Sequence, residues 1–352
     1  MNIKITGTGS FIPSIIEKNN DFLDHIFLTE EGIPFKQNNE TIISKFKAIT
    51  GIGERRYAKN EFKASDLAFE AAQKALSDAN VDKEKLDYII VAHNYGDIAH
   101  GSVQSDTVPS IASRVKHLLR IKNNYCVAYD LLFGCPGWIE AIIQAQAFMK
   151  AGMAQKCLVI GCETLSRVID IHDRDSMIYS DGAGAAILEN KKKGHGILAH
   201  ETLTCSYDEA FYIFFGSSYN KNINQNTRFI KMYGRKIYEF AITQVPMAMK
   251  ACFEKSGEKL SNLKKIFIHQ ANEKMDEAIV KRFYKLYDEE VPEFITPMNI
   301  HKLGNSSVAT VPTLFDMVRK GKLKNQELHK GDVIIFASVG AGMNINAVVY
   351  KY

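Results

Sequence analysis

A cysteine in a tight turn is the first residue of this sequence that could do chemistry. Cys135 follows a strand-like segment, Tyr129 to Phe133, and a glycine, and it precedes Pro136 and a long apolar stretch. Proline is favoured at the first position of a helix, so the pattern predicts a helix that starts at Pro136 with Cys135 as its N-cap. The partial positive charge of a helix start lowers the pKa of a thiol and makes the sulfur a nucleophile. For this segment alone, a buried structural cysteine is the alternative.

Two polar positions could assist such a nucleophile. His269 directly follows the apolar segment Ile266-Phe-Ile, at a strand end where α/β proteins place ligand-binding and catalytic groups. Asn305 lies in Gly304-Asn-Ser-Ser, before another apolar stretch. Taken singly, the alternatives are a strand-end histidine with satisfied hydrogen bonds and an asparagine in a turn. His93 stands in an equivalent place in the first half of the chain, and no catalytic role suggests itself there.

The elements that must position these residues occur twice. A helix, a polar turn and an apolar strand are predicted from Ala64 to His93 and again from Phe240 to His269, and a shift of 176 residues superposes the two copies. The same shift places Pro136 on Pro312. Apolar strands that alternate with helices indicate buried sheets covered by helices, so we expect a duplicated α/β protein packed in about five layers. Chance similarity between helix-strand units is the alternative.

The boundary between the two predicted halves lies in a linker rich in charge and glycine. The linker Lys191-Lys-Lys-Gly-His-Gly separates an N-terminal domain, residues 1–190, from a C-terminal domain, residues 191–352. Two stretches, Ile12 to Lys47 and Leu203 to Thr227, interrupt the symmetry. Insertions at such places usually line the binding site of an α/β fold.

Composition excludes several classes of protein. The chain has 352 residues, 46% of them hydrophobic and 24% charged, which is typical of a globular protein with a full core. The net charge of +4 and the absence of a basic block longer than Lys191 to Lys193 argue against nucleic acid as a partner. No signal peptide or membrane-spanning segment is predicted, so we expect a cytoplasmic protein.

The cysteine and glycine patterns argue against a metal or a nucleotide cofactor. The six cysteines include no Cys-x-x-Cys pair, so neither a zinc site nor a disulfide scaffold is expected. Gly7-Thr-Gly-Ser-Phe-Ile has isoleucine where a dinucleotide fingerprint requires its third glycine, and Gly182-Ala-Gly precedes a strand rather than a helix.

Together the motifs resemble the β-ketoacyl-acyl-carrier-protein synthase III family of the thiolase superfamily, over nearly the whole chain. The segments that carry the resemblance are Gly7-Thr-Gly-Ser, Thr50-Gly-Ile-Gly-Glu-Arg-Arg-Tyr, the Cys135 turn, Tyr179-Ser-Asp-Gly-Ala-Gly-Ala-Ala, His269-Gln-Ala-Asn, Gly304-Asn-Ser-Ser and Gly340-Ala-Gly. The resemblance implies an α/β thiolase fold, in which two α/β domains pack as a five-layered αβαβα sandwich. It also implies an acyltransferase that performs a decarboxylative Claisen condensation.

The resemblance assigns roles to individual residues. Cys135 would carry the acyl group, while His269 and Asn305 would stabilise the enolate formed from a malonyl, or 3-oxoacyl, thioester. Backbone N–H groups of Cys135 and Ala341 would form the oxyanion hole. The remaining implied contacts are Arg174 and Asn272 for phosphopantetheine and Lys274 for the acidic acyl carrier protein.

The resemblance also implies partners. They are a second copy of the chain in a homodimer, acyl carrier protein, and acyl-coenzyme A or acyl-carrier thioesters, with no cofactor besides these substrates.

Two departures from the family pattern leave alternatives open. The tryptophan that stacks on coenzyme A in typical members is missing near Lys45 and Phe46, and the nucleophile lies in Gly-Cys-Pro-Gly. The aromatic stretch Phe211-Tyr-Ile-Phe-Phe suggests an unusual acyl pocket. The alternatives are a specialised dialkylresorcinol-type ketosynthase that joins two longer acyl chains, a cysteine acyltransferase or hydrolase, and a non-catalytic acyl-binding subunit.

Overall fold

The computed structural model of the chain describes residues 2–191 and 194–352. Met1 of the predicted N-terminal domain, and Lys192 and Lys193 of the predicted linker, lie outside the described residues. The fold contains two main sheets, and each draws its strands from one half of the chain.

The first sheet has five strands. They are β1 (Asn2–Phe11), β4 (Tyr88–Ala92), β5 (Val127–Leu131), β6 (Lys156–Thr164) and β7 (Asp181–Lys191). Their order in the sheet is β1-β7-β6-β4-β5, with β4 parallel to both β5 and β6. Apolar runs such as Leu158-Val-Ile in β6 are buried on both faces, as expected for a strand covered by helices on either side.

The second sheet repeats this arrangement without a counterpart of β5. Its strands are β8 (Ile197–Thr204), β11 (Leu263–Ile268), β12 (Val333–Gly340) and β13 (Asn344–Lys351). The order β11-β12-β13-β8 matches β4-β6-β7-β1 when the strands are paired by their order in each half. The shared topology agrees with the duplication predicted from the sequence.

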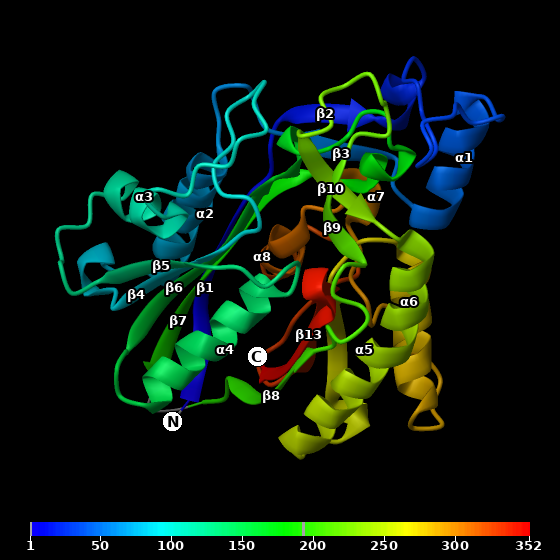
Figure 1. The fold of residues 1–352 in the computed structure, drawn as a ribbon. Coiled ribbons are helices and arrows are strands. Elements are labelled where there is room, and N and C mark those ends of the chain that lie inside the picture. Colours follow the sequence, from blue (N-terminus) through cyan, green and yellow to red (C-terminus); the bar gives the residue numbers. More distant parts are fainter. Residues whose placement is uncertain (1, 192–193) are drawn as a thin grey trace.

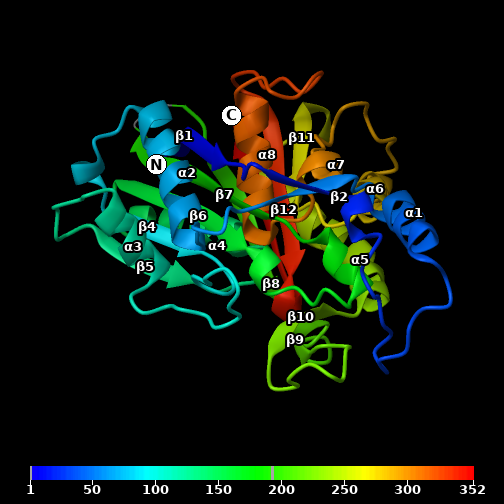
Figure 2. The same ribbon diagram turned by 90° about the horizontal axis from the view of Figure 1, so that it is seen from above.

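Helices cover both sheets and fill the space between them (Figures 1 and 2). They are α2 (Ala64–Ala79) and α3 (Ile111–Leu118) on the outer face of the first sheet, α4 (Gly137–Lys150) and α8 (Thr310–Arg319) between the sheets, and α5 (Gly234–Ser256) and α6 (Glu273–Lys285) on the outer face of the second. The layers therefore run helix, sheet, helix, sheet, helix, as expected from the sequence.

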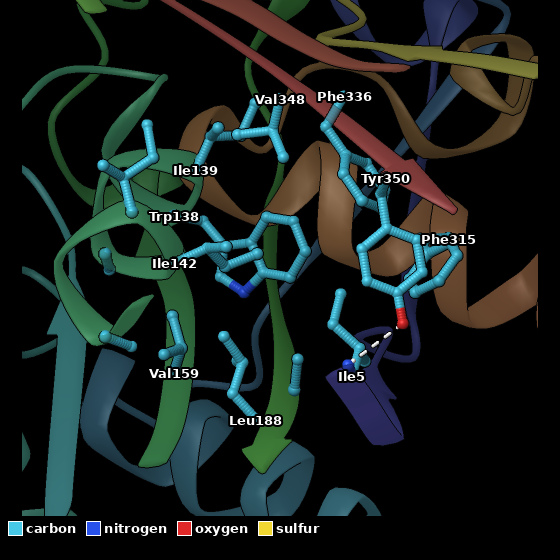
Figure 3. Close-up of a cluster of buried hydrophobic side chains, with 14 of the residues drawn as sticks. Ile5, Trp138, Ile139, Ile142, Val159, Leu188, Phe315, Phe336, Val348 and Tyr350 are labelled. Atoms are coloured by element: carbon cyan, nitrogen blue, oxygen red, sulfur yellow. Dashed lines mark hydrogen bonds between the residues drawn. The ribbon is translucent and has the colours of Figure 1, made fainter. Parts of the chain in front are cut away.

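The central layer holds the largest aromatic side chains. Trp138 on α4 meets Phe336 of β12 edge to face, with ring centroids 5.8 Å apart, and Phe315 on α8 lies 5.0 Å from the same ring (Figure 3). The backbone N–H of Ile5 donates to the Tyr350 hydroxyl, which joins β1 of the first sheet to β13 of the second. The central hydrophobic cluster thus contains residues of both halves, while each half also has a cluster of its own.

The two asymmetric stretches form smaller elements at the top of the view in Figure 1. They contain β2 (Ile15–Lys18), α1 (Asn39–Thr50) and β9 (Ile213–Ser217), together with the partner strands β3 (Glu54–Tyr57) and β10 (Arg228–Met232). A fully buried ion pair fastens the β9–β10 hairpin, because Lys231 Nζ lies 2.7 Å from Asp170 and 3.1 Å from Asp173. Arg55 of β3 is also fully buried and donates to the backbone of Met177.

The shorter helical elements complete the chain. They are η1 (Asn19–Phe22), η2 (Lys83–Lys85), η3 (Leu165–Arg167), η4 (Arg174–Ile178), η5 (Leu260–Asn262), α7 (Ile300–Leu303), η6 (Ser307–Ala309) and η7 (Ala341–Met343).

Candidate active site

Cys135 lies in the turn between β5 and α4, as the sequence predicts. The detail of the turn differs, because Pro136 is the N-cap and Gly137 is the first helical residue. Cys135 therefore precedes the helix by one more residue than expected. The proline adopts helical dihedral angles while still standing outside the helix, and this moves the predicted boundary by one position.

The prediction of a lowered thiol pKa is wrong for the free protein. Burial raises the pKa of Cys135 to about 11, and the negative charge of Glu163 acts in the same direction. A hydrogen bond from the Ser307 hydroxyl to Sγ, 3.2 Å long, acts the other way. Desolvation of the charged form outweighs these polar contacts, so the resting group is a neutral thiol.

His269 directly follows β11, and its backbone N–H donates to the carbonyl of Ala337 on β12. Its Nδ1 lies 2.6 Å from the Thr310 hydroxyl, which in turn donates to the Ser307 carbonyl. With that hydroxyl hydrogen in use, Nδ1 carries the ring proton and Nε2 is an acceptor. Burial lowers the pKa of His269 to about 4, so the ring is neutral at physiological pH.

Thr310 can also support the other tautomer of His269. The Ser307 carbonyl accepts the backbone N–H of Thr310 as well as its hydroxyl hydrogen. If the hydroxyl turns to donate to Nδ1 instead, this carbonyl keeps a partner and Nε2 becomes a donor. Thr310 therefore allows His269 either to accept or to donate a proton at Nε2.

Asn305 is buried and held at three points. Its backbone N–H donates to the Ile178 carbonyl, and its own carbonyl accepts from Ser180. The side-chain oxygen accepts the backbone N–H of Ser307 at 2.8 Å. Since Oδ1 is engaged in this way, Nδ2 is the part of the amide that remains to donate to a ligand.

Two glycines, Gly134 and Gly340, allow the backbone at Cys135 to approach the end of β12 closely. A Cβ on Gly340 would lie 2.4 Å from the Cys135 nitrogen, and one on Gly134 would lie 2.7 Å from the Ala341 nitrogen. Only residues without a side chain permit such an approach. In the described part of the chain, no backbone carbonyl accepts the N–H of Cys135 or of Ala341.

A narrow cavity of about 60 Å³ joins these groups. Cys135, His269, Asn305, Ser307 and Ala341 all line it. The remaining walls are mostly apolar, and they also contain two phenols and an amide. These residues are Asn94, Tyr95, Gly134, Leu165, Ile178, Tyr179, Ile213, Ile230, Met232, Ile237, Ala271, Met275 and Val339.

A groove of about 810 Å³ shares part of its wall with this cavity. The two spaces have five apolar lining residues in common, namely Ile178, Met232, Ile237, Ala271 and Met275. Arg174 and Asn272 line the groove, and Asn272 is also the N-cap of α6. Lys274 is exposed on the first turn of α6.

The N-terminal insertion supplies one side of this groove. Lys45 and Phe46 on α1 line it, at the position where the family tryptophan was expected. The Arg174 guanidinium lies 4.5 Å from the centre of the Phe35 ring, so a cation and an aromatic surface meet there. The second insertion contributes less than predicted, because within the stretch Phe211 to Phe215 only Ile213 lines the inner cavity.

Four polar residues near the nucleophile were not identified from the sequence. Ser307 and Thr310 follow the recognised Asn305 closely, so their nearness along the chain was an available signal. Asn94 follows β4 and bonds both Ser307 and Glu163 of β6, and nothing in the local sequence of Asn94 or Glu163 indicates these contacts. Within residues 2–191 and 194–352, no group of three or more potential ligands is placed to hold a metal ion.

None of the described helices has both the length and the apolar character needed to span a bilayer.

Comparison with known proteins identifies the family. Residues 129–205 match the model of 3-oxoacyl-[acyl-carrier-protein] synthase III, and residues 253–352 match that of its C-terminal part. The β-ketoacyl-[acyl-carrier-protein] synthase III of Caldanaerobacter subterraneus is 34% identical over 99% of this chain and 97% of its own. The chain belongs to the β-ketoacyl-acyl-carrier-protein synthase III family.

Solved structures of synthase III proteins agree. The crystal structure of the Aquifex aeolicus synthase III superposes with a TM-score of 0.82 and 29% identity, covering all of both chains. The curated Aquifex aeolicus sequence is 31% identical over the full length of both chains. The expectations of a thiolase fold and of a 3-oxoacyl synthase III-like condensing enzyme are thereby confirmed, as is the broad class of acyltransferase.

Proposed function

We propose that this synthase III joins a short acyl group, held on Cys135, to a malonyl unit carried as a thioester. The observation that carries the proposal is the meeting of Cys135, His269 and Asn305 in one cavity next to the groove. Such a site contains a nucleophile and two neutral polar groups. It suits the stabilisation of an enolate, which requires donors in a largely dry environment.

In the proposed acylation step, the Cys135 sulfur attacks the carbonyl carbon of an acyl thioester. The N–H groups of Cys135 and Ala341 donate to the oxygen as it becomes negative. The thiol proton passes through Nε2 of His269 to the leaving thiolate, so the donor departs as a free thiol and the acyl group remains on Cys135. The neutral ring and the available Nε2 of His269 support this role.

In the proposed condensation step, a malonyl thioester loses carbon dioxide and becomes an enolate. Nδ2 of Asn305 and Nε2–H of His269 donate to the enolate oxygen, with the Thr310 hydroxyl turned toward Nδ1. The carbanion attacks the acyl carbon, a carbon–carbon bond forms, and the Cys135 sulfur leaves. The reaction uses no cofactor besides its thioester substrates.

The groove is the proposed site of the phosphopantetheine arm, with Arg174 and Asn272 as contacts and Lys274 outside it facing the acyl carrier protein. Arg174 offers a phosphate a charged and partly exposed partner, because its side chain is 49% exposed. The inner cavity, at about 60 Å³, has room for only a few heavy atoms, which favours a short acyl group over the long chains of a dialkylresorcinol-type enzyme.

A homodimer is the proposed assembly. β5 is an edge strand of the first sheet, and Val127 in it and Leu132 beside it are exposed in the single chain. An apolar edge of this kind is a common place for strand pairing between two copies. The cytoplasm is the proposed location, since all six cysteines are free thiols.

The test is intact-mass spectrometry after incubation with short and long acyl-coenzyme A and acyl-carrier thioesters, followed by malonyl-carrier. We expect an acyl adduct on the protein that Cys135→Ala loses and Cys205→Ala, a matched control at a half-buried cysteine, retains. Asn305→Ala should acylate but not condense. Acyl transfer to water or an alcohol without release of carbon dioxide would contradict the proposal and support an acyltransferase or hydrolase.

A further inference from the structure

Among the described residues, Ser307 has the one side chain that forms a hydrogen bond to the Cys135 sulfur. Its hydroxyl oxygen lies 3.2 Å from Cys135 Sγ. The residue has φ +51°, in the left-handed region that is uncommon for residues other than glycine. Its backbone N–H is held by the Asn305 side chain, and its own side chain is buried. A strained backbone that is fixed in this way places the hydroxyl at the sulfur.

Asn94 determines the direction of this hydrogen bond. Its Nδ2 lies 3.0 Å from the Ser307 hydroxyl oxygen, and an amide nitrogen can only donate. The Ser307 oxygen therefore accepts from Asn94, and its single hydrogen remains free for the sulfur. The donors run in one direction, from Asn94 to Ser307 to Cys135.

Glu163 holds the orientation of Asn94. One carboxyl oxygen lies 2.5 Å from the same Nδ2, and the Asn94 backbone also donates to this carboxyl group. Burial raises the pKa of Glu163 to about 8, so the group is mostly protonated at neutral pH and accepts these bonds as a neutral acid. Glu163 lies on β6, the central strand of the first sheet, and is 1% exposed. A buried carboxyl group that accepts from an amide fixes which end of the amide faces Ser307.

We propose that Ser307 is a further catalytic residue, which stabilises the Cys135 thiolate by donating its hydroxyl hydrogen to the sulfur, and that Asn94 and Glu163 position it. The thiolate forms as Cys135 attacks and again when the sulfur leaves after condensation. Because the site is buried, a donor to the charged sulfur counts for more there than in water. The inference rests on Cys135 being the nucleophile of the proposed function, but it concerns the sulfur before any substrate binds.

The test measures the rate at which iodoacetamide alkylates Cys135 across a pH series, read by intact mass. This rate follows the thiolate population and needs no acyl substrate. We expect Ser307→Ala to lower the rate at neutral pH about ten- to a hundredfold and to move the midpoint of the profile upward. Ser306→Ala, the matched control at a neighbouring buried serine, should leave the profile unchanged.

Two further variants test the direction of the donors. Asn94→Asp replaces the donor by an acceptor that draws the Ser307 hydrogen away from sulfur, so it should reproduce the loss seen in Ser307→Ala. Glu163→Gln keeps an acceptor for the Asn94 amide and should alkylate within about threefold of the parent. Thermal unfolding verifies that each variant is folded, and either donor variant suffices if the other does not fold.

Parent-like alkylation of a folded Ser307→Ala or Asn94→Asp protein would overturn the proposal. Such a result would mean that the sulfur donates to Ser307 rather than accepting from it. The proposed function can fail separately. If the parent protein forms no acyl adduct, while Ser307→Ala still moves the midpoint of the alkylation pH profile upward, the acyl chemistry is refuted and the role of Ser307 at the sulfur stands.

Discussion

His93 and His269 occupy the same place in the two halves of the molecule, yet their surroundings differ. Each directly follows the equivalent strand, β4 or β11, and each donates its backbone N–H to a neighbouring strand, His93 to Leu131 of β5 and His269 to Ala337 of β12. His93 uses both ring nitrogens, because Nδ1 accepts from Gly96 and Nε2 lies 2.9 Å from Asp130. In His269, the Thr310 hydroxyl lies at Nδ1, and Nε2 remains available to a ligand.

This difference shows that an equivalent position at a strand end does not give two histidines the same hydrogen-bond partners. The carboxylate of Asp130 also accepts the N–H groups of Ile111 and Ala112 at the start of α3, so His93 is part of a structural network. At the corresponding place in the second half, His269 lines a cavity together with the neighbouring side chains. The role proposed for His269 therefore depends on the absence of a polar partner at Nε2 among the described residues as much as on the presence of Thr310 at Nδ1.

The largest effect that would sharpen this comparison is expected from His269→Ala. Loss of one donor to the enolate should lower kcat for condensation about 10²- to 10³-fold, because that interaction forms chiefly in the transition state. The thermal unfolding midpoint should change little. Condensation assays with saturating substrates provide the measurement, and a parent-like kcat would show that the retained Nε2 has no role.

His93→Ala should have the opposite pattern. Removal of the ring takes one hydrogen-bond partner from Asp130, leaves the Gly96 N–H without its acceptor and creates a cavity, so the free energy of unfolding should fall by about 3 kcal/mol. The kcat of the folded fraction should stay close to that of the parent. Urea unfolding at fixed pH measures the first quantity, and a selective loss of kcat would break the proposed division between the two histidines.

A pH titration provides a third comparison. The pKa of His269 is lowered by burial to about 4, against about 6.5 in the unfolded chain, so the unfolded state binds more protons between these values. The stability that depends on a neutral His269 is therefore complete above pH 6.5 and is lost as the pH falls toward 4. Relative to His269→Gln, the parent should lose about 2 kcal/mol more between neutral pH and pH 5, measured by urea unfolding. Equal losses would show that the folded ring is not held neutral.

The smallest effect is expected from Thr310→Val, which keeps the shape of the side chain and removes the hydroxyl. His269 then loses the hydroxyl that can either accept from or donate to its Nδ1. Since one neutral hydrogen bond is lost, kcat should fall about tenfold or less. Val311, the next residue on α8, offers a control in Val311→Thr, which adds a hydroxyl away from His269. A loss larger than that of His269→Ala would indicate damage to the fold rather than to proton placement.

Much of the architecture could be predicted from local patterns. The period of the apolar residues placed α2, β4, α5 and β11, and the 176-residue shift anticipated the matching order of the two sheets. Cys135, His269 and Asn305 meet in one cavity, as the motifs suggested, while their roles remain proposals.

The features that sequence reasoning missed depend on contacts between distant segments. Burial by other elements raises the pKa of Cys135, whereas its place at a helix start had predicted a lowered pKa. Asn94 links Ser307 to Glu163, and the three residues come from three separate segments of the chain. Within the aromatic insertion, Ile213 at the start of β9 lines the cavity rather than a phenylalanine, and the pairing of β9 with β10 that places it there is not evident from the local sequence.

The contact between Gly340 and the Cys135 turn has a consequence for biosynthesis. The ribosome synthesises Cys135 long before Ala341, because Cys135 lies between β5 and α4 and Ala341 lies between β12 and β13, the last two strands of the chain. Strand β13 must then enter between β12 and β8 before that turn is fixed. On the ribosome, the growing polypeptide therefore carries Cys135 without the Ala341 N–H that we propose for the oxyanion hole, and the proposed acyl transfer requires that the second sheet has first formed.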